Sequence, residues 1–136
     1  MPGCRAHGVH MGRILVVDDC EDICHALARL LRQAGHDVDK AYDGLAALES
    51  AAAGTPPELI ILDIMMPKMD GLEVLNRLKS NDATADVPVV MFSAVQDADT
   101  VGRAFESGAI DFWLKASFNF GELGDRVRTL MKQPPA

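Results

Sequence analysis

Short, mostly apolar runs alternate along this chain with segments in which leucines recur at helical spacing. The runs at 14–17, 59–62, 87–92 and 110–114 have the length and composition of strands buried on both faces of a sheet, whereas 38–42 has the more polar pattern of an edge strand. A helical pattern follows each run, and regular strand–helix alternation makes a parallel sheet with helices on both faces. The sequence therefore predicts one α/β domain of five strand–helix pairs.

Residues that stop or cap helices stand where this pattern needs them. Glycine ends helices, and an aspartate or asparagine side chain caps a helix at its start by accepting from a free backbone N–H. Asp70 followed by Glu73 has the spacing of a capping box, and two glycines weaken the first turns of the last helix. The predicted stop and cap residues are Gly35, Asp43, Asp70 and Asn119.

The length and charge of the chain argue against some functions. Its 136 residues suffice for one ordinary domain. With 13 basic against 20 acidic residues, the formal net charge is −7, which argues against direct binding to nucleic acid because that needs a basic surface. No apolar run has the length of a membrane span, and the first residues lack the apolar centre of a signal peptide. We therefore expect neither a membrane protein nor a direct nucleic-acid binder.

The cysteines indicate a compartment. There are three, an odd number, and Cys20 and Cys24 lie one helical turn apart. A disulfide framework is therefore not expected, and a reducing cytoplasm is. A structural zinc site would need four ligands, and no second cluster in the sequence completes the set. We expect these thiols to be small, half-buried side chains.

Polar side chains follow four of the five predicted strands at the point where each strand ends. Asp18 and Asp19 follow the first strand and Asp63 the third, while Ser93 and Lys115 end the fourth and fifth. The carboxyl ends of parallel strands meet at one edge of the sheet, where open α/β sheets bind their ligands. Each residue alone would be an ordinary cap, turn or surface residue. Together they predict a functional site.

Three carboxylates at one edge repel one another unless they share protons or a cation. Mg²⁺ fits because it prefers oxygen ligands, keeps several waters and needs only one or two carboxylates. The Lys115 ammonium can pair with Asp63 and later with an anionic phosphoryl group, to which the Ser93 hydroxyl can also donate. The set therefore contains a nucleophile, a metal site and two electrophilic groups, as phosphoryl transfer requires.

These residues stand in four motifs: ILVVDD at 14–19, LDIMMPKMDG at 62–71, SA at 93–94 and FWLK at 112–115. In this order, at strand ends and over most of the chain, they resemble the receiver domain of two-component response regulators. The resemblance implies a flavodoxin-like, doubly wound sheet of five parallel strands in the order 2-1-3-4-5, with five helices.

The resemblance also assigns roles at the predicted site. Asp63 matches the residue that accepts the phosphoryl group. Asp19 matches the main acidic ligand of Mg²⁺, and Asp18 matches its partner, which often acts through water. Met65 would lend its backbone carbonyl to the metal.

Three further residues match the parts of the family that respond to phosphorylation. Ser93 matches the hydroxyl that moves toward the phosphoryl group, Lys115 the ion-pairing lysine, and Phe112 the aromatic residue that turns inward when the hydroxyl moves. One departure is Ala116, because receivers usually have a proline, often in cis, after the lysine. A cis bond without proline costs about 3–4 kcal/mol. We expect a trans bond here, or a strained cis bond, and a loop into the last helix that differs from the family's.

Domain limits and partners follow from the resemblance too. Residues 12–132 would form the receiver domain, 1–11 a disordered extension or tag remnant, and 133–136 a tail. The phosphoryl donor would be the phosphohistidine of a sensor histidine kinase or phosphotransfer protein, or a small molecule such as acetyl phosphate. A downstream protein or output domain would bind a surface near the last helix–strand–helix segment, and homodimer formation is left open. The domain would be no enzyme in the usual sense, because it catalyses only its own phosphorylation and dephosphorylation.

Three other functions are compatible with parts of this pattern. Phosphatases that form an aspartyl phosphate also use a strand-end aspartate and Mg²⁺, but they resemble one another in a second aspartate two residues later, where this chain has Met65. A flavin- or nucleotide-binding module would want a Gly/Ser/Thr-rich phosphate loop after the first strand, where Asp18 and Asp19 repel phosphate instead. The intact acidic set argues against a receiver that only docks, without phosphorylation.

Overall fold

A computed structural model describes residues 12–94 and 96–131, and both chain ends predicted as an extension and a tail lie outside these ranges. Its five strands are all parallel and run in the order β2-β1-β3-β4-β5. This confirms the fold class, including the strand order implied by the resemblance. The strands are β1 (Arg13–Val17), β2 (Asp37–Ala41), β3 (Leu59–Leu62), β4 (Val89–Ser93) and β5 (Asp111–Leu114).

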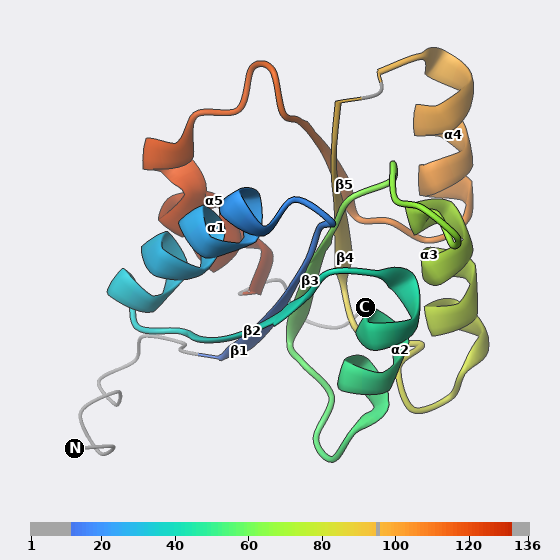
Figure 1. The fold of residues 1–136 in the computed structure, drawn as a ribbon, viewed down its shortest axis with the longest axis horizontal. Coiled ribbons are helices and arrows are strands. Elements are labelled where there is room, and N and C mark those ends of the chain that lie inside the picture. Colours follow the sequence, from blue (N-terminus) through green and yellow to red (C-terminus); the bar gives the residue numbers. More distant parts are fainter. Residues whose placement is uncertain (1–11, 95, 132–136) are drawn as a thin grey trace.

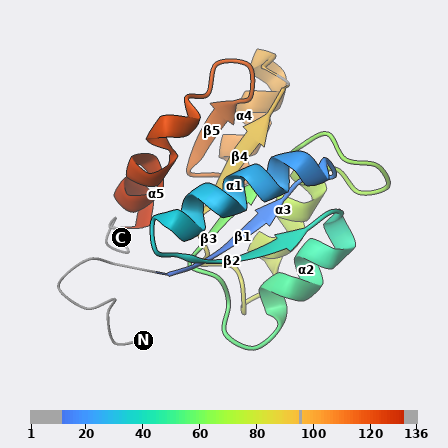
Figure 2. The same ribbon diagram turned by 60° about the vertical axis from the view of Figure 1, so that its left-hand side comes forward.

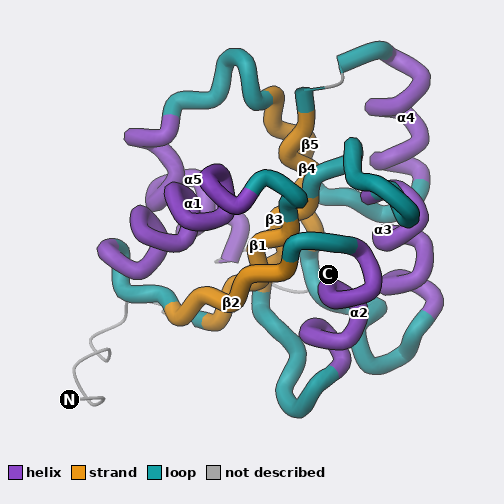
Figure 3. Tube along the Cα trace, in the orientation of Figure 1, coloured by secondary structure: helices purple, strands orange, loops and turns teal. Residues whose placement is uncertain are grey.

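Helices cover both faces of the sheet, as the alternating pattern predicts. In Figures 1 and 2, α1 and α5 lie on one face, and α2, α3 and α4 lie on the other. Figure 3 shows the strands enclosed between these two helical layers. The helices are α1 (Glu21–Gln33), α2 (Gly44–Ala52), α3 (Gly71–Ser80), α4 (Ala98–Glu106) and α5 (Leu123–Met131), and a 3-10 turn, η2 (Phe120–Glu122), precedes the last.

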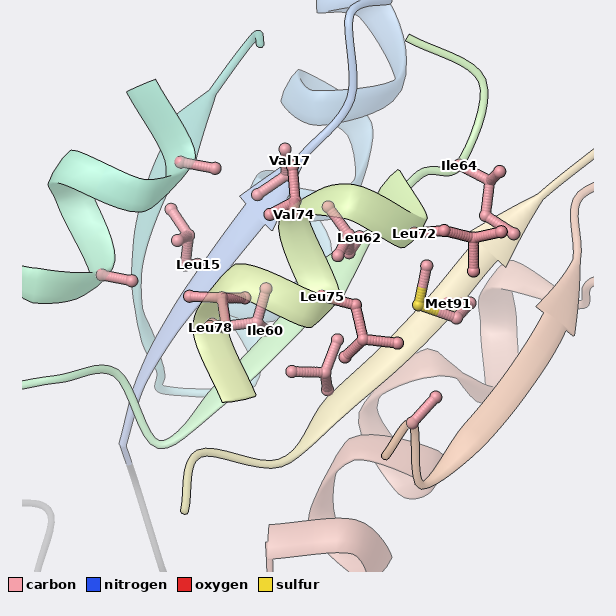
Figure 4. Close-up of a cluster of buried hydrophobic side chains, with 14 of the residues drawn as sticks. Leu15, Val17, Ile60, Leu62, Ile64, Leu72, Val74, Leu75, Leu78 and Met91 are labelled. Carbon is pink, nitrogen blue, oxygen red and sulfur yellow. The ribbon is translucent and has the colours of Figure 1, made fainter. Parts of the chain in front are cut away.

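The core is divided by the sheet into two apolar clusters. Alternate strand residues point to opposite faces, so neighbouring positions in β1 and β3 enter different clusters. Figure 4 shows α3 lying over the cluster on its own face of the sheet. Strand residues on this face include Leu15, Val17, Ile60 and Leu62. Those on the opposite face, under α1 and α5, include Ile14, Val16, Leu59 and Ile61.

Helix boundaries agree with the predicted caps at most positions. Asp43 accepts from Ala46 N at 2.8 Å and Asp70 accepts from Glu73 N at 2.9 Å. The last helix differs, because Asn119 caps the turn η2 and the α-helix begins only at Leu123. Gly121 and Gly124, the two glycines predicted to weaken these turns, lie in η2 and in the first turn of α5. None of the helices in the described ranges combines the length and apolar character that a membrane crossing requires.

Candidate functional site

The carboxyl ends of β1 and β3 bring three aspartates together. Val17 pairs with Leu62 in the parallel register, so the residues that follow these strands leave the sheet side by side. Asp63 N donates to Val17 O at 2.9 Å. Asp18, Asp19 and Asp63 each offer a ligand oxygen, and these three atoms lie within 4.8 Å of one another. The loops after β1, β3 and β5 run along this same edge of the sheet (Figure 1).

Lys115 joins the acidic group from the end of β5. Its Nζ lies 2.7 Å from Asp18 Oδ2 and 3.4 Å from Asp63 Oδ1. The predicted pairing with Asp63 is therefore present, but the shorter ion pair is with Asp18. Since Lys115 N also donates to Ser93 O at 2.9 Å, the ends of β4 and β5 are tied together beside the carboxylates.

Two carboxylates of this site are buried, so the charged groups strongly affect one another's pKa. Asp18 and Asp63 are 1% and 2% exposed. Burial, followed by repulsion from Asp18, raises the pKa of the Asp63 carboxyl to about 6 from its ordinary value of 3.8, even though Lys115 opposes the rise. Burial acts to lower the pKa of Lys115, but its hydrogen bond to Asp18 and the charge of Asp63 outweigh this and raise it. The lysine is therefore held as a cation.

The geometry fits a hard divalent cation. Oxygens on opposite sides of a Mg²⁺ ion lie about 4 Å apart, and the three aspartate ligand atoms lie within 4.8 Å of one another, which is close to this span. Buried Asp18 Oδ2 has no partner among the described residues apart from the Lys115 ammonium. Three carboxylates so close together repel one another, and one ammonium cannot balance all of their charge, so these residues suit Mg²⁺.

The other predicted site residues, Ser93, Met65 and Phe112, lie at different depths in the protein. Ser93 is fully buried at the end of β4, next to the strand that precedes Asp63. Met65 is 61% exposed, and its N–H reaches Asp63 Oδ1 at 3.4 Å. Phe112 is half-buried and packs against the cluster on the α3 side of the sheet. The aspartates do not cap α1, because its N-cap is Cys20, whose N–H donates to Asp18 Oδ1.

Comparison with known proteins decides the family. The model of the Response regulator receiver domain family matches residues 14–128, which is most of the chain. The chain belongs to this family. Curated relatives of the receiver domain include the DNA-binding dual master transcriptional regulator RpaA of Synechocystis, 39% identical over 123 residues and 90% of this chain. The transcriptional regulatory protein PrrA of Mycobacterium leprae is 41% identical over 126 residues and 93% of this chain.

Solved receiver structures share the fold. The chemotaxis protein CheY4 of Vibrio cholerae is 27% identical with a TM-score of 0.80, covering 88% of this chain and 98% of that one. The receiver domain of the Francisella response regulator 1452 is 30% identical with a TM-score of 0.80, covering 89% and 97%. The chain spans about half the length of the curated relatives it matches, 50% of RpaA and 52% of PrrA.

The peptide bond after Lys115 has one of the two conformations expected from the sequence. Described peptide bonds include no cis bond, so Lys115–Ala116 is trans, the first of the two alternatives.

The expectation of half-buried thiols is wrong, because Cys20 is exposed and Cys24 is fully buried. Cys24 Sγ donates to Asp18 O at 3.3 Å, and burial raises the pKa of this thiol to about 12. The thiol therefore supports the backbone of a site residue, a contact that helical spacing alone does not reveal.

The sequence does not predict the aromatic cluster that lies beside Lys115. The rings of Phe92, Trp113, Phe118 and Phe120 lie in contact, and the Lys115 ammonium lies 5.7 Å from the Phe92 ring centre. The only signal in the sequence is the unusual density of aromatic residues around the predicted lysine. This density of aromatic residues does not predict that the rings lie on one face of the sheet.

Gly71 fixes the backbone of the receiver's Asp63 loop, and its replacement by alanine should disturb the site. An added Cβ would lie 2.1 Å from Asp63 O and 2.7 Å from Ile64 Cα. We expect Gly71→Ala to cost about 1–3 kcal/mol in the free energy of unfolding, because tight packing against backbone cannot relax easily. Urea denaturation measures this. Gly102→Ala in α4 is the control, since its Cβ meets nothing within 4 Å. Equal stabilities of the two variants would contradict the close contact.

Proposed function

We propose that this receiver domain is a phosphorylation switch in which Asp63 accepts the phosphoryl group. The observation that carries the proposal is the meeting of Asp18, Asp19 and Asp63 within 4.8 Å, with the Lys115 ammonium against two of them. Such a group of like charges is costly in isolation. A cation bound among the carboxylates would offset this repulsion and would also allow an anionic phosphoryl group to approach.

The donor set supports Mg²⁺ as the cofactor. We assign Asp19 and Asp18 as acidic ligands, with Asp63 and the backbone carbonyl of Met65 completing the protein's share. When bound, Mg²⁺ would offset the negative charge of the carboxylates and of the phosphoryl oxygens.

Asp63 would act as the nucleophile. With a pKa near 6, its carboxyl is largely ionised at neutral pH. One carboxylate oxygen attacks phosphorus in line with the leaving group, the new O–P bond forms an acyl phosphate, and the P–N or P–O bond of the donor breaks with its electron pair leaving on the donor. Lys115 stays protonated and moves from its aspartate partners toward a phosphoryl oxygen.

The switch would follow from contacts that exist only with the phosphoryl group in place. The Ser93 hydroxyl is proposed to donate to a phosphoryl oxygen, and Phe112 to turn inward as Ser93 moves. Phosphorylation shifts the population only by the difference in its interactions with the two conformations. Ser93 and Phe112 lie on neighbouring strands, with Phe112 paired to Met91 in β4, which supports such coupling.

The partners belong to this proposal as well. The donor would be the phosphohistidine of a sensor histidine kinase or phosphotransfer protein, and the domain would catalyse only its own phosphorylation and dephosphorylation. Residues 12–132 would form the receiver domain. The curated relatives are transcriptional regulators about twice as long as the matched region, so a downstream protein or output domain, rather than direct nucleic-acid contact by this chain, is the proposed target.

Intact-mass measurement tests this function. After incubation with acetyl phosphate and Mg²⁺, the wild-type chain should gain the mass of one phosphoryl group, and chelation should prevent the gain. Asp63→Ala should remove it, whereas the control Asp82→Ala, which changes an exposed aspartate outside the site, should not. An unchanged wild-type mass with acetyl phosphate and with phosphoramidate, or a gain that persists in Asp63→Ala, would contradict the proposal.

A further inference from the structure

The segment that leads from Lys115 to the last helix has little in its backbone to hold it. Ala116 and Ser117 are both exposed. Ser117 N donates to Leu114 O across a long 3.3 Å hydrogen bond. A lysine carries its ammonium on a flexible four-carbon stem, so a loosely held backbone at this point would leave the charge poorly placed.

Phe118 supplies the anchor that the backbone lacks. Its ring stacks on Trp113 with centres 4.9 Å apart and planes at 26°. It also meets Phe92 edge-on at 5.2 Å and Phe120 at 5.4 Å. The guanidinium of Arg126 in α5 lies 5.6 Å from the Phe118 ring centre, on the same cluster. Aromatic contacts of this kind stabilise beyond the area they bury.

The same rings reach the proposed phosphorylation site. Phe92 pairs with Trp113 between β4 and β5, and it directly precedes Ser93. The Lys115 ammonium lies 5.7 Å from the Phe92 ring centre while it contacts the carboxylates of Asp18 and Asp63. One side of the ammonium therefore faces the Phe92 ring, which Phe118 contacts.

We propose that Phe118 is a positioning residue for Lys115. By packing onto Phe92 and Trp113, it fixes the segment after β5 and the ring beside the ammonium, and so directs the charge toward Asp18 and Asp63. Its effect on phosphorylation rests on the function proposed above, but its effect on the position of Lys115 does not. Sequence position alone would make Phe118 only a core residue.

Chemical labelling of lysines tests the position directly. An ammonium held between carboxylates reacts slowly with an acetylating reagent such as acetyl N-hydroxysuccinimide, and peptide mass mapping gives the rate at each lysine. Phe118→Ala should raise the labelling rate of Lys115 severalfold and leave that of exposed Lys68 unchanged. Phe118→Tyr, which keeps the ring, should restore the slow rate. Phe118→Leu serves if the alanine variant fails to fold, because it keeps apolar volume and removes the stacking.

A double-mutant cycle separates positioning from a general loss of stability. Phe118→Ala should lower the rate of phosphorylation by acetyl phosphate about tenfold or more, as small misplacements of a reacting group do. In a Lys115→Ala background the same change should lower the rate no further, because there is no ammonium left to position. Its cost in thermal stability should be equal in both backgrounds.

The outcomes distinguish the two proposals. If wild type is not phosphorylated but Phe118→Ala exposes Lys115 to labelling, the positioning proposal stands and the proposed function fails. If labelling of Lys115 is the same in folded wild type, Phe118→Ala and Phe118→Leu, the positioning proposal is overturned. Equal rate losses from Phe118→Ala with and without Lys115 would also overturn it.

Discussion

Asp19→Asn should slow phosphorylation by acetyl phosphate by about two orders of magnitude, the scale of loss seen when one preorganised electrostatic group is removed from a reaction site. The neutral amide oxygen is a weaker ligand for Mg²⁺ than a carboxylate, and the change also removes one of three charges within 4.8 Å of one another. Because Asp19 is exposed, the fold should be preserved. Stopped reactions followed by intact mass give the rate, and calorimetric titration gives the Mg²⁺ affinity.

Asp22→Asn is the matched control for this effect. It makes the same charge change three residues along the chain, in the first turn of α1, where the side chain is exposed and outside the acidic cluster. We expect it to leave both the rate and the Mg²⁺ affinity close to wild type. If the two variants bind Mg²⁺ equally well, Asp19 is not a ligand. Chelation of the metal should reduce wild type to at most the rate of Asp19→Asn.

Asp63→Asn should make the metal-free domain more stable at pH 8. The pKa of Asp63 is about 6 in the folded state against an ordinary value of 3.8, so the folded chain holds this proton more tightly than the unfolded chain does. Ionisation is then unfavourable to the fold, and stability falls as the pH rises from near 4 through 6. The amide avoids this loss, which amounts to about 3 kcal/mol for a shift of this size.

The pH dependence of this gain is its most specific feature. The difference in unfolding free energy between Asp63→Asn and wild type should be largest above pH 6 and should vanish as the pH falls below about 4, where the carboxyl is protonated in both states. Mg²⁺ should also reduce the difference, because it stabilises wild type by binding the folded state. Urea denaturation with chelator at pH 4 and pH 8 measures this, with Asp82→Asn as an exposed control. A gain independent of pH would show that the cost of ionising buried Asp63 beside Asp18 is not its cause.

The sequence predicts those parts of this protein that depend on local pattern. Apolar runs of strand length, followed by Asp18, Asp63 and Lys115, are enough to place these side chains at one edge, because parallel strands end together. The polar character of 38–42 likewise predicts an edge strand, and β2 lies at the edge. Helix caps such as Asp43 and Asp70 depend on neighbours three residues away, so they too are legible in the sequence.

Details that depend on tertiary packing could not be predicted in this way. Lys115 lies closer to Asp18 than to Asp63, although β3, which precedes Asp63, is nearer to β5 in the sheet than β1 is. This preference depends on side-chain conformation, which no spacing in the sequence records. The burial of Cys24 follows from how α1 packs on the sheet. Phe118 meets Phe92 only after the chain has turned back over the sheet, so its contact with the site is invisible until the fold is known.

A crystal soaked with Mn²⁺, which takes similar oxygen ligands and has a measurable anomalous signal, tests the central claim most directly. We predict one anomalous peak at the carboxyl edge of the sheet, bounded by carboxylate oxygens of Asp19 and Asp63 and by the carbonyl of Met65. A fully occupied ion bound elsewhere, with these oxygens unliganded, would contradict the account.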